Sequence, residues 1–289
     1  MASRLLDPPR WTLPSPESAS GCFETMRAYQ GKIFRLPAHL GRLFASAKYL
    51  GFRMPLESHQ LGRRLIERLR ASGLEEAVVR VACLPDANRA AVPSIVVQPA
   101  QRPSPAMYRR GIRITVVPTR KFPVSQIDPR SKFSSRLGSV MAVVEAQLRG
   151  ADEAVFLDGT GSVTESTASN LGLVKHGCLV APPGWMGLLA GITWQAVTDV
   201  ARALRMPVRE VPLTRHDVYN ADEAFLASTL KEVLAVTQVD GRRIGTGKPG
   251  PYTKRLHRGF QELVHREIRN TRYEIRDDCC ETGVTELLR

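Results

Sequence analysis

Apolar and polar positions follow two rhythms along the first third of the chain. Apolar side chains at helical spacing predict amphipathic helices, and short β-branched runs predict strands. A Gln30-Gly31 pair between two β-forming runs predicts a tight turn. The predicted elements are a hairpin over 23–33, helices over 38–50 and 58–72, and strands over 77–83 and 94–98. This order predicts a compact α/β unit.

The same rhythms continue beyond residue 100 in a different order. A strand at 112–117 stands in a proline-rich stretch, and Asp158-Gly-Thr-Gly161 predicts a turn between later strands. The other predicted elements are a helix over 140–148, strands over 154–157, 171–174 and 178–181, and a helix over 192–204. The mixture predicts a second α/β unit.

Proline and charge predict where these units begin and end. Four prolines within the first 20 residues predict an extended arm, because each proline removes a backbone donor and fixes φ. A highly charged C-terminal segment predicts a disordered tail. The predicted organisation is an arm over 1–20, an N-terminal α/β domain over 21–117, a linker over 118–126, a C-terminal domain over 127–270 and a charged tail over 271–289.

Composition predicts the compartment. A chain of 289 residues can bury one large core or two ordinary ones without crosslinks. The five cysteines are odd in number and show no C-x-x-C spacing, which indicates a reducing cytoplasm. No apolar run approaches the roughly 20 residues of a membrane span, and the N-terminus lacks the apolar core of a signal peptide. We therefore expect a soluble, cytoplasmic protein with no membrane partner.

Several other chemistries find no support in the sequence. The net charge of +13 would permit nucleic-acid binding, but the basic residues are scattered and no RNA-binding or zinc-finger signature accompanies them. A basic surface that attracts anionic substrates is the simpler interpretation. The six histidines form no H-x-x-x-H pair, so no metal site is expected. The glycine-rich run over 245–251 lacks the G-x-x-x-x-G-K-[ST] spacing of a phosphate loop.

Lys132 and Glu165 are the most informative polar residues. A lysine that forms a Schiff base and a carboxylate that faces a pyridine nitrogen are the groups that pyridoxal 5′-phosphate (PLP) chemistry most needs. Lys121, Arg130 and Arg136 stand near Lys132 in sequence, and neighbouring cations favour a neutral amine. Judged on local sequence alone, an exposed lysine and a turn carboxylate remain ordinary interpretations.

Two further positions predict the binding of anions. Gly191-Ile-Thr193 opens the predicted helix over 192–204, and the free amides and dipole of a helix N-terminus attract phosphate. Arg80 lies within a valine-rich strand, where a charge is costly unless it is paired. Arg80 is therefore either salt-bridged or aimed at an anionic substrate, and the sequence leaves both interpretations open.

These residues belong to an ordered series of motifs over about residues 21–251. The motifs are Gly21-Cys-Phe-Glu-Thr-Met-Arg-Ala-Tyr29, His39-Leu-Gly-Arg-Leu43, Lys132-Phe-Ser-Ser-Arg-Leu137, the run from Asp158 to Asn170, Leu189-Ala-Gly-Ile-Thr193 and Ala221-Asp-Glu-Ala-Phe-Leu-Ala-Ser-Thr229. The series resembles the fold type IV PLP-dependent enzymes. That family includes branched-chain aminotransferases, D-amino acid aminotransferases and aminodeoxychorismate lyases.

The resemblance implies an α/β (α+β type) fold with a small N-terminal domain, a larger C-terminal pseudo-barrel domain, PLP at their junction, and a homodimer. It implies that Lys132 is the catalytic lysine, which binds the PLP aldehyde. The matching cofactor-binding positions are Glu165 at the pyridine nitrogen, and Arg42, Ile192, Thr193 and Thr229 at the phosphate. The matching substrate-binding positions are Tyr29, Arg80 and Leu230.

The function that the resemblance implies is an aminotransferase, branched-chain-like, that moves an amino group between an amino acid and a 2-oxo acid. Two departures keep alternatives open. Leu137 stands where branched-chain enzymes usually carry tyrosine, and Arg136-Leu137 is similar to a segment of the lyases. Trp194 replaces a common arginine and is expected to alter local packing. The alternatives are an aminodeoxychorismate lyase, a D-amino acid aminotransferase and a non-catalytic PLP-binding protein.

Overall fold

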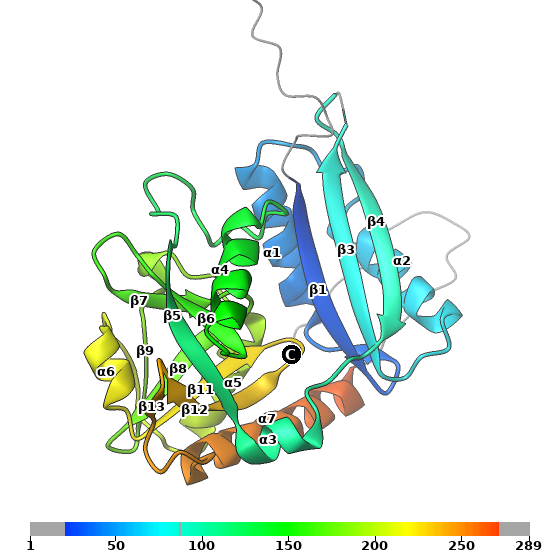
Figure 1. Cartoon of the computed structure of the whole chain (residues 1–289). Helices are drawn as coiled ribbons and strands as arrows, with labels where there is room; N and C mark the ends of the chain where they lie inside the picture. The colour runs from blue at the N-terminus through cyan, green and yellow to red at the C-terminus, as the bar shows by residue number, and fades with distance from the viewer. Residues whose placement is uncertain (1–20, 87, 272–289) are drawn as a thin grey trace, which may run out of the picture.

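The computed structural model describes residues 21–86 and 88–271, so the predicted arm and nearly all of the predicted tail, with its Cys279-Cys280 pair, lie outside the described residues. The N-terminal part is a four-stranded antiparallel sheet, in the order β2-β1-β3-β4, packed against two helices (Figure 1). The predicted hairpin, helices and strands are confirmed with small shifts at their ends. These elements are β1 (Cys22–Tyr29), β2 (Lys32–Ile33), α1 (Leu36–Tyr49), α2 (Ser58–Ala71), β3 (Ala77–Pro85) and β4 (Ala91–Pro99).

Strand β1 presents side chains to two different surfaces, because successive residues of a strand point to opposite faces. Met26 and Ala28 lie in the core between the sheet and the helices α1 and α2. Phe23 and Arg27 lie on the opposite face, where they contact Lys132 and Glu232 of the C-terminal part. One face of β1 therefore builds the N-terminal core, and the other forms a wall of the junction between the two sheets.

The C-terminal part is a nine-stranded mixed sheet in the order β10-β9-β8-β11-β12-β5-β6-β7, with β13 beside β12. Its strands are β5 (Ile112–Arg120), β6 (Glu153–Leu157), β7 (Val163–Ser166), β8 (Asn170–Lys175), β9 (Cys178–Ala181), β10 (Val208–Glu210), β11 (Glu223–Ser228), β12 (Glu232–Val239) and β13 (Arg242–Arg243). Helix α3 (Pro105–Arg110) connects the two sheets. The helical elements of the C-terminal part are α4 (Leu137–Leu148), the short η2 (Gly184–Met186), α5 (Ile192–Ala203), α6 (Arg215–Tyr219) and α7 (Pro251–Asn270).

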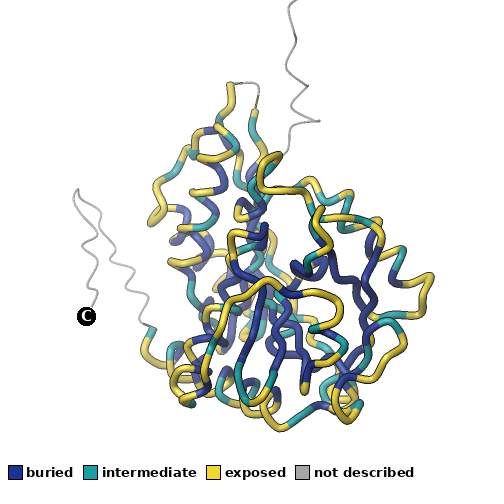
Figure 2. Tube along the Cα trace, turned by 90° about the vertical axis from the view of Figure 1, so that its left-hand side faces the viewer, coloured by how far each residue is buried: buried dark blue, intermediate teal, exposed yellow. Residues whose placement is uncertain are grey.

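Helices cover the curved C-terminal sheet on its outside. Ala142 and Ala146 of α4 pack against β5 and β6, and α5 and α7 share a core with Phe225 of β11. The inner face of the sheet encloses a separate core of aliphatic side chains, including Ile114 and Leu234. Figure 2 shows buried stretches along the strands and exposed loops around them. The predicted elements over 140–148, 154–157, 171–174, 178–181 and 192–204 are all confirmed.

The observed fold differs from the sequence prediction in the assignment of one strand and in several elements that were not predicted. The strand predicted at 112–117 was assigned to the N-terminal domain, but β5 pairs in parallel with β12 and β6 inside the second sheet. The connection between the sheets therefore includes α3, which precedes β5, rather than the predicted linker over 118–126. Parallel partners lie far apart in sequence, so the strand itself carries no local signal of its neighbours. Helix α7 and the strands β11 and β12 were not predicted from the sequence.

The two parts meet at the beginning of β1. The amide of Phe23 donates to the carbonyl of Lys132 (3.0 Å), and the amide of Ser134 donates to the carbonyl of Gly21 (2.7 Å). Cys22 and Phe133 form an isolated antiparallel bridge between these hydrogen bonds. The segment that follows β5 is thereby fixed to β1. This pairing positions Lys132 at the junction between the two sheets.

Candidate active site

Lys132 is a partly buried amine at the junction of the two sheets. Its amide donates to Ser46 Oγ of α1 (3.0 Å), and its Nζ lies 4.9 Å from the centre of the Phe23 ring. Burial, followed by the positive charge of Arg42, lowers the pKa of Lys132 to about 8 from the ordinary 10.5. An amine with such a pKa has an appreciable neutral fraction near physiological pH, and this neutral form is nucleophilic and able to accept a proton.

Glu165 lies on β7 and is buried, but several donors surround its carboxylate. Lys121 forms an ion pair with Oε1. The amide of Leu189 (3.1 Å) and Nδ2 of Asn170 (3.4 Å) donate to Oε2. These donors compensate the buried carboxylate for the hydration that it loses. Glu165 can therefore stabilise a positive charge on a bound ring nitrogen.

The start of α5 forms a cradle for an anion. Gly191 is the N-cap of this helix and supplies no side chain, so the first amides of the helix, at Ile192 and Thr193, are available to a ligand. A Cβ atom at residue 191 would overlap Oδ1 of Asn170, which explains the glycine. Arg42 reaches the same loop through a hydrogen bond from Nη1 to the carbonyl of Ala190 (2.6 Å).

Glu24, a residue to which the sequence analysis gave no role, holds Arg42 in place. Its carboxylate accepts two hydrogen bonds from Arg42, at 2.6 and 2.8 Å, and contacts Nδ1 of His39 at 2.8 Å. Burial alone would raise the pKa of Glu24, but hydrogen bonds from Arg42 and His39 outweigh it and lower the pKa to about 2. Bidentate pairing of this kind fixes the orientation of a guanidinium. Glu24 could have been noticed in the first motif, two residues after Cys22.

Phe23 is the second residue that the sequence analysis missed. Besides Lys132, the guanidinium groups of Arg80 (4.8 Å) and Arg136 (6.0 Å) lie over its ring. Arg136 also donates to the carbonyl of Thr167. Aromatic faces attract cations, so Phe23 gathers three positive groups on one side of the junction. Such a group of cations can bind carboxylates of a substrate next to the Lys132 amine.

The remaining predicted site residues lie in two places. Thr229 and Leu230 belong to the tight loop between β11 and β12, and both are partly exposed. Tyr29 is buried, its ring packs against Phe34, and its hydroxyl donates to Glu232 (3.2 Å). Tyr29 lies six residues beyond Phe23 on β1, or about 20 Å along a strand. The structure therefore gathers Lys132, Arg42, Glu165, Arg80 and the start of α5, whereas the Tyr29 hydroxyl is bound to Glu232, directly after the loop of Thr229 and Leu230.

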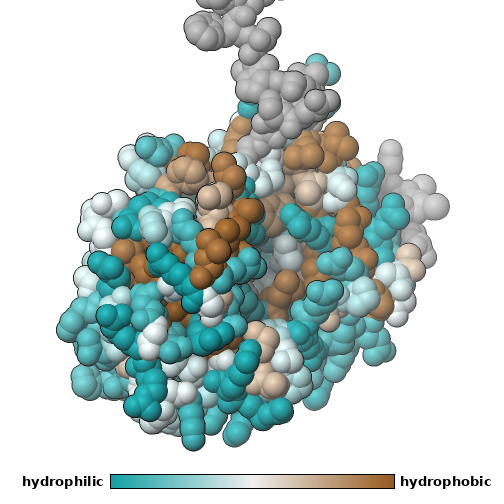
Figure 3. Space-filling model, viewed as in Figure 1, coloured by the Kyte–Doolittle hydropathy of each residue, from teal (hydrophilic) through white to brown (hydrophobic). Residues whose placement is uncertain are grey.

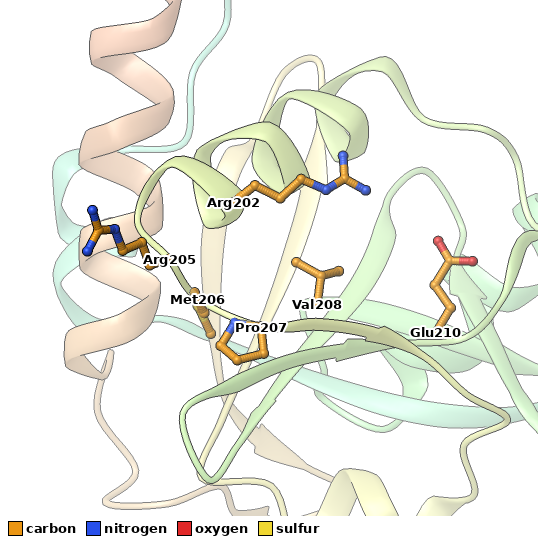
Figure 4. Close-up of a pocket in the computed structure, with 6 residues that line it drawn as sticks. All are labelled: Arg202, Arg205, Met206, Pro207, Val208 and Glu210. Atoms are coloured by element: carbon orange, nitrogen blue, oxygen red, sulfur yellow. The ribbon is translucent and has the colours of Figure 1, made fainter.

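A surface pocket of about 660 Å³ lies at the other end of α5 (Figure 4). Arg202, Arg205 and Glu210 are among the residues that line it. This pocket is separated from Ile192 and Thr193 by the whole length of α5, so it is not part of the candidate site. Within residues 21–86 and 88–271, no group of His, Cys, Asp and Glu side chains has the arrangement of a metal site. No helix among those residues is long and apolar enough to span a membrane.

Comparison with known proteins identifies the family. Residues 21–239 match the family model described as amino-transferase class IV. Similar proteins include the branched-chain-amino-acid aminotransferase of Pseudomonas aeruginosa, which is 33% identical over 84% of this chain and 84% of its own length. The D-alanine aminotransferase of Listeria monocytogenes is 32% identical over 85% and 87%, respectively.

The same family appears among solved structures. The T.th. branched-chain amino acid aminotransferase with pyridoxamine 5′-phosphate has a TM-score of 0.82 at 31% identity, with 85% of each chain covered. A second structure of that enzyme contains N-(5′-phosphopyridoxyl)-L-glutamate, with a TM-score of 0.80 at 31% identity and 84% coverage of each chain.

The fold and the family match define a PLP-dependent transaminase of fold type IV, as the sequence predicted. This chain belongs to the class IV aminotransferase family. Its overall similarity is to branched-chain aminotransferases, and the predicted branched-chain-like aminotransferase activity is confirmed at that level.

Proposed function

We propose that Lys132 is the amine of this transaminase that binds the PLP aldehyde and moves the substrate α-proton. The observation that carries the proposal is the lowered pKa of Lys132, about 8, in a junction that also contains Arg42 and Glu165. A group with a pKa near the working pH is effective both as base and as acid. The same amine can therefore take a proton from one carbon atom and return it to another.

The other residues bind and orient. When bound, PLP supplies an aldehyde that accepts the amino group and a ring that withdraws electrons from the substrate. The amides at the start of α5, with the Thr193 and Thr229 hydroxyls and Arg42, would hold its phosphate. Glu165 would keep its ring nitrogen protonated, and the Lys121 ion pair and the Asn170 amide keep Glu165 in place. This set fits the group, because the phosphate would meet amides, hydroxyls and a guanidinium, and the protonated ring nitrogen would meet a carboxylate.

For substrates, we propose branched-chain amino acids as amine donors and a 2-oxo acid as acceptor. Arg80 and Arg136 beside Lys132 support recognition of carboxylates, and the buried Phe23 ring supports contact with an aliphatic side chain. Relatives at nearly equal identity carry the names of branched-chain and D-alanine aminotransferases. The chirality of the donor is therefore the first point to test.

Two measurements test this function. Borohydride reduction followed by peptide mapping should place the pyridoxyl group on Lys132, and Lys132→Ala should abolish the visible absorption band of bound PLP. A label on another lysine overturns the assignment. Spectra of the half-reaction with a panel of L- and D-amino acids should then show conversion with L-leucine, L-isoleucine and L-valine. A half-reaction with D-alanine alone would instead make the protein a D-amino acid aminotransferase.

We also propose a homodimer. Helix α4 buries only Ala142 and Ala146, whereas its large apolar side chains remain exposed, including Leu137 (73%) and Leu148 (84%). Figure 3 shows apolar surface over α4 on the face seen in Figure 1. Contiguous exposed apolar surface of this kind is typical of subunit interfaces, and a second copy is the simplest occupant. Sedimentation should show a dimer that Val140→Lys dissociates; a wild-type monomer overturns the proposal.

The reducing cytoplasm is the compartment that the cysteines support. Cys22 and Cys83 are directly opposed in the register of β1 and β3, and both are buried free thiols. Such neighbours would be candidates for a disulfide in an oxidising compartment. We therefore propose a cytoplasmic location, which fractionation of cells with an antibody against the full chain would test.

A further inference from the structure

Glu232 is a buried carboxylate that the proposed reaction does not use. It opens β12 and pairs with Ser228, the last residue of β11. The loop between these two residues is Thr229, Leu230 and Lys231, which contains two predicted site residues. Glu232 therefore closes the loop that presents Thr229 to the cofactor phosphate and Leu230 to the substrate.

The backbone of Glu232 shows that its side chain is needed there. Its φ is +51°, in the left-handed region that favours glycine. Glycine adopts this conformation without strain, whereas a residue with a Cβ atom rarely does. A glutamate at such a position is retained only when its contacts compensate for the strained backbone.

The contacts of Glu232 join three separate elements. Oε1 accepts hydrogen bonds from Nη1 of Arg27 (2.8 Å) and from the Tyr29 hydroxyl (3.2 Å), both on β1. Oε2 contacts Nε2 of His257 (2.9 Å) and Nε2 of Gln261 (3.4 Å), both on α7. One carboxylate thus fixes the hairpin loop to β1 on one side and to α7 on the other.

Neighbouring groups strengthen the same arrangement. Arg27 is also buried and extends its second nitrogen to Glu76 (3.1 Å), while its guanidinium covers the Tyr29 ring at 4.3 Å. The Tyr108 hydroxyl donates to the carbonyl of Lys231 within the loop (3.0 Å), and the Tyr108 ring stacks on His257. Among the buried side-chain polar atoms of these residues only Nε of Arg27 lacks a partner, and buried polar networks with nearly all members paired hold one conformation rigidly.

We propose that Glu232 is a positioning residue for the cofactor: it fixes the loop of Thr229, Leu230 and Lys231 against β1, so that the phosphate site keeps its shape. The proposal rests on the proposed role of Thr229. It also gives Tyr29 a different task from substrate contact, because the Tyr29 hydroxyl is committed to Glu232. Glu232 acts through the loop and touches no reacting atom.

Glu232→Gly tests the proposal with little backbone strain, since glycine accepts the left-handed conformation. The dissociation constant of PLP from the full-length protein should rise roughly 10-fold or more, as small displacements of binding groups typically cause. At saturating PLP, kcat should stay within about three-fold of wild type, because Lys132 is unaffected. Glu232→Gln should give an intermediate constant, since its amide oxygen still accepts from Arg27 and Tyr29.

Matched controls separate this role from general stability. His176→Gly replaces another non-glycine residue with positive φ, an exposed one in the turn between β8 and β9, and should leave PLP affinity unchanged. Equal PLP affinity in Glu232→Gly and wild type, or a loss of kcat as large as the loss of affinity, overturns the proposal. Thr229→Val separates the two assignments: if it weakens PLP binding while Glu232→Gly does not, only the positioning role fails. If it leaves binding unchanged, the role of Thr229 fails.

Discussion

Lys132 lowers the free energy of unfolding near neutral pH. Its pKa falls to about 8 in the folded protein, mainly through burial, while the unfolded chain keeps a value of 10.5. The folded state therefore binds fewer protons between these values, and the free energy of unfolding rises with pH through that window. At neutral pH the partly buried ammonium destabilises the fold by at most roughly 3 kcal/mol.

Lys132→Met should consequently stabilise the PLP-free protein. We expect a Tm increase of several degrees near neutral pH, at roughly 2–4 °C per kcal/mol, because methionine is buried without charge. The increase should shrink as pH approaches about 10.5, where the unfolded lysine also loses its proton. Lys48→Met, at the exposed end of α1, is the control. A Tm difference that does not change with pH would contradict this account.

Glu24 stabilises the folded protein when it is charged, whereas Lys132 destabilises it. Its pKa is lowered to about 2 from the ordinary 4.5, so its ionised form stabilises the fold fully above pH 4.5. That stabilisation is lost as the pH falls from 4.5 towards 2. Glu24→Gln should lower the free energy of unfolding at neutral pH by roughly 3 kcal/mol, as expected when a buried pair loses one partner. Urea unfolding of this variant should be less sensitive to acid in that window, whereas exposed Glu67→Gln should behave as wild type.

Arg80 determines specificity if the site works as proposed. It lies on the β3 face shared with Phe23, and its guanidinium covers the Phe23 ring. Arg80→Met should lower kcat/KM for a dicarboxylate partner such as 2-oxoglutarate by roughly 1.5–3 kcal/mol more than for an apolar substrate. Arg70→Met on α2 is the control. Equal losses for both substrates would make Arg80 a structural residue.

The start of α5 depends on Gly191, which has no side chain. Gly191→Ala would drive a Cβ atom into Oδ1 of Asn170, whose amide nitrogen also donates to Glu165. We expect PLP affinity to fall by roughly 10-fold or more, because both the helix start and Glu165 are displaced. Gly184→Ala is a matched control in the preceding loop, where an added Cβ meets no atom within 4 Å. Equal affinities of the two variants would argue against phosphate binding at α5.

At the scale of the whole molecule, the cofactor site joins two separately built parts. The N-terminal sheet supplies Phe23, Arg80 and, through α1, Arg42, while Lys132, Glu165 and α5 belong to the C-terminal part. A ligand held by both parts stabilises only the assembled fold. PLP at 100 times its dissociation constant should add about 2.7 kcal/mol, or several degrees in Tm. Thermal unfolding with and without PLP measures this shift, and an unchanged Tm would mean that the site does not join the two parts.

Much of this protein could be predicted from local patterns. The helices α1, α2, α4 and α5 have apolar stripes or clear stops, and the strands β3, β8 and β9 are short apolar runs. Helix α7 was not predicted, because it is highly charged apart from an apolar stripe through Leu256, Phe260 and Leu263. The motif order predicted the cofactor and the family, because the chemistry of PLP restricts the residue types around it.

Tertiary structure alone decided which residues meet. The sequence put β5 with the N-terminal domain, and only parallel pairing with β12 and β6 assigned it to the second sheet. Roles could be predicted for Arg42 and Tyr29 but not for Glu24 and Phe23. The contacts of each face of β1 depend on how the sheets and α1 pack around this strand. Residue types determined the available chemistry; contacts between segments distant in the chain determined the pKa of Lys132 and the partners of Glu232.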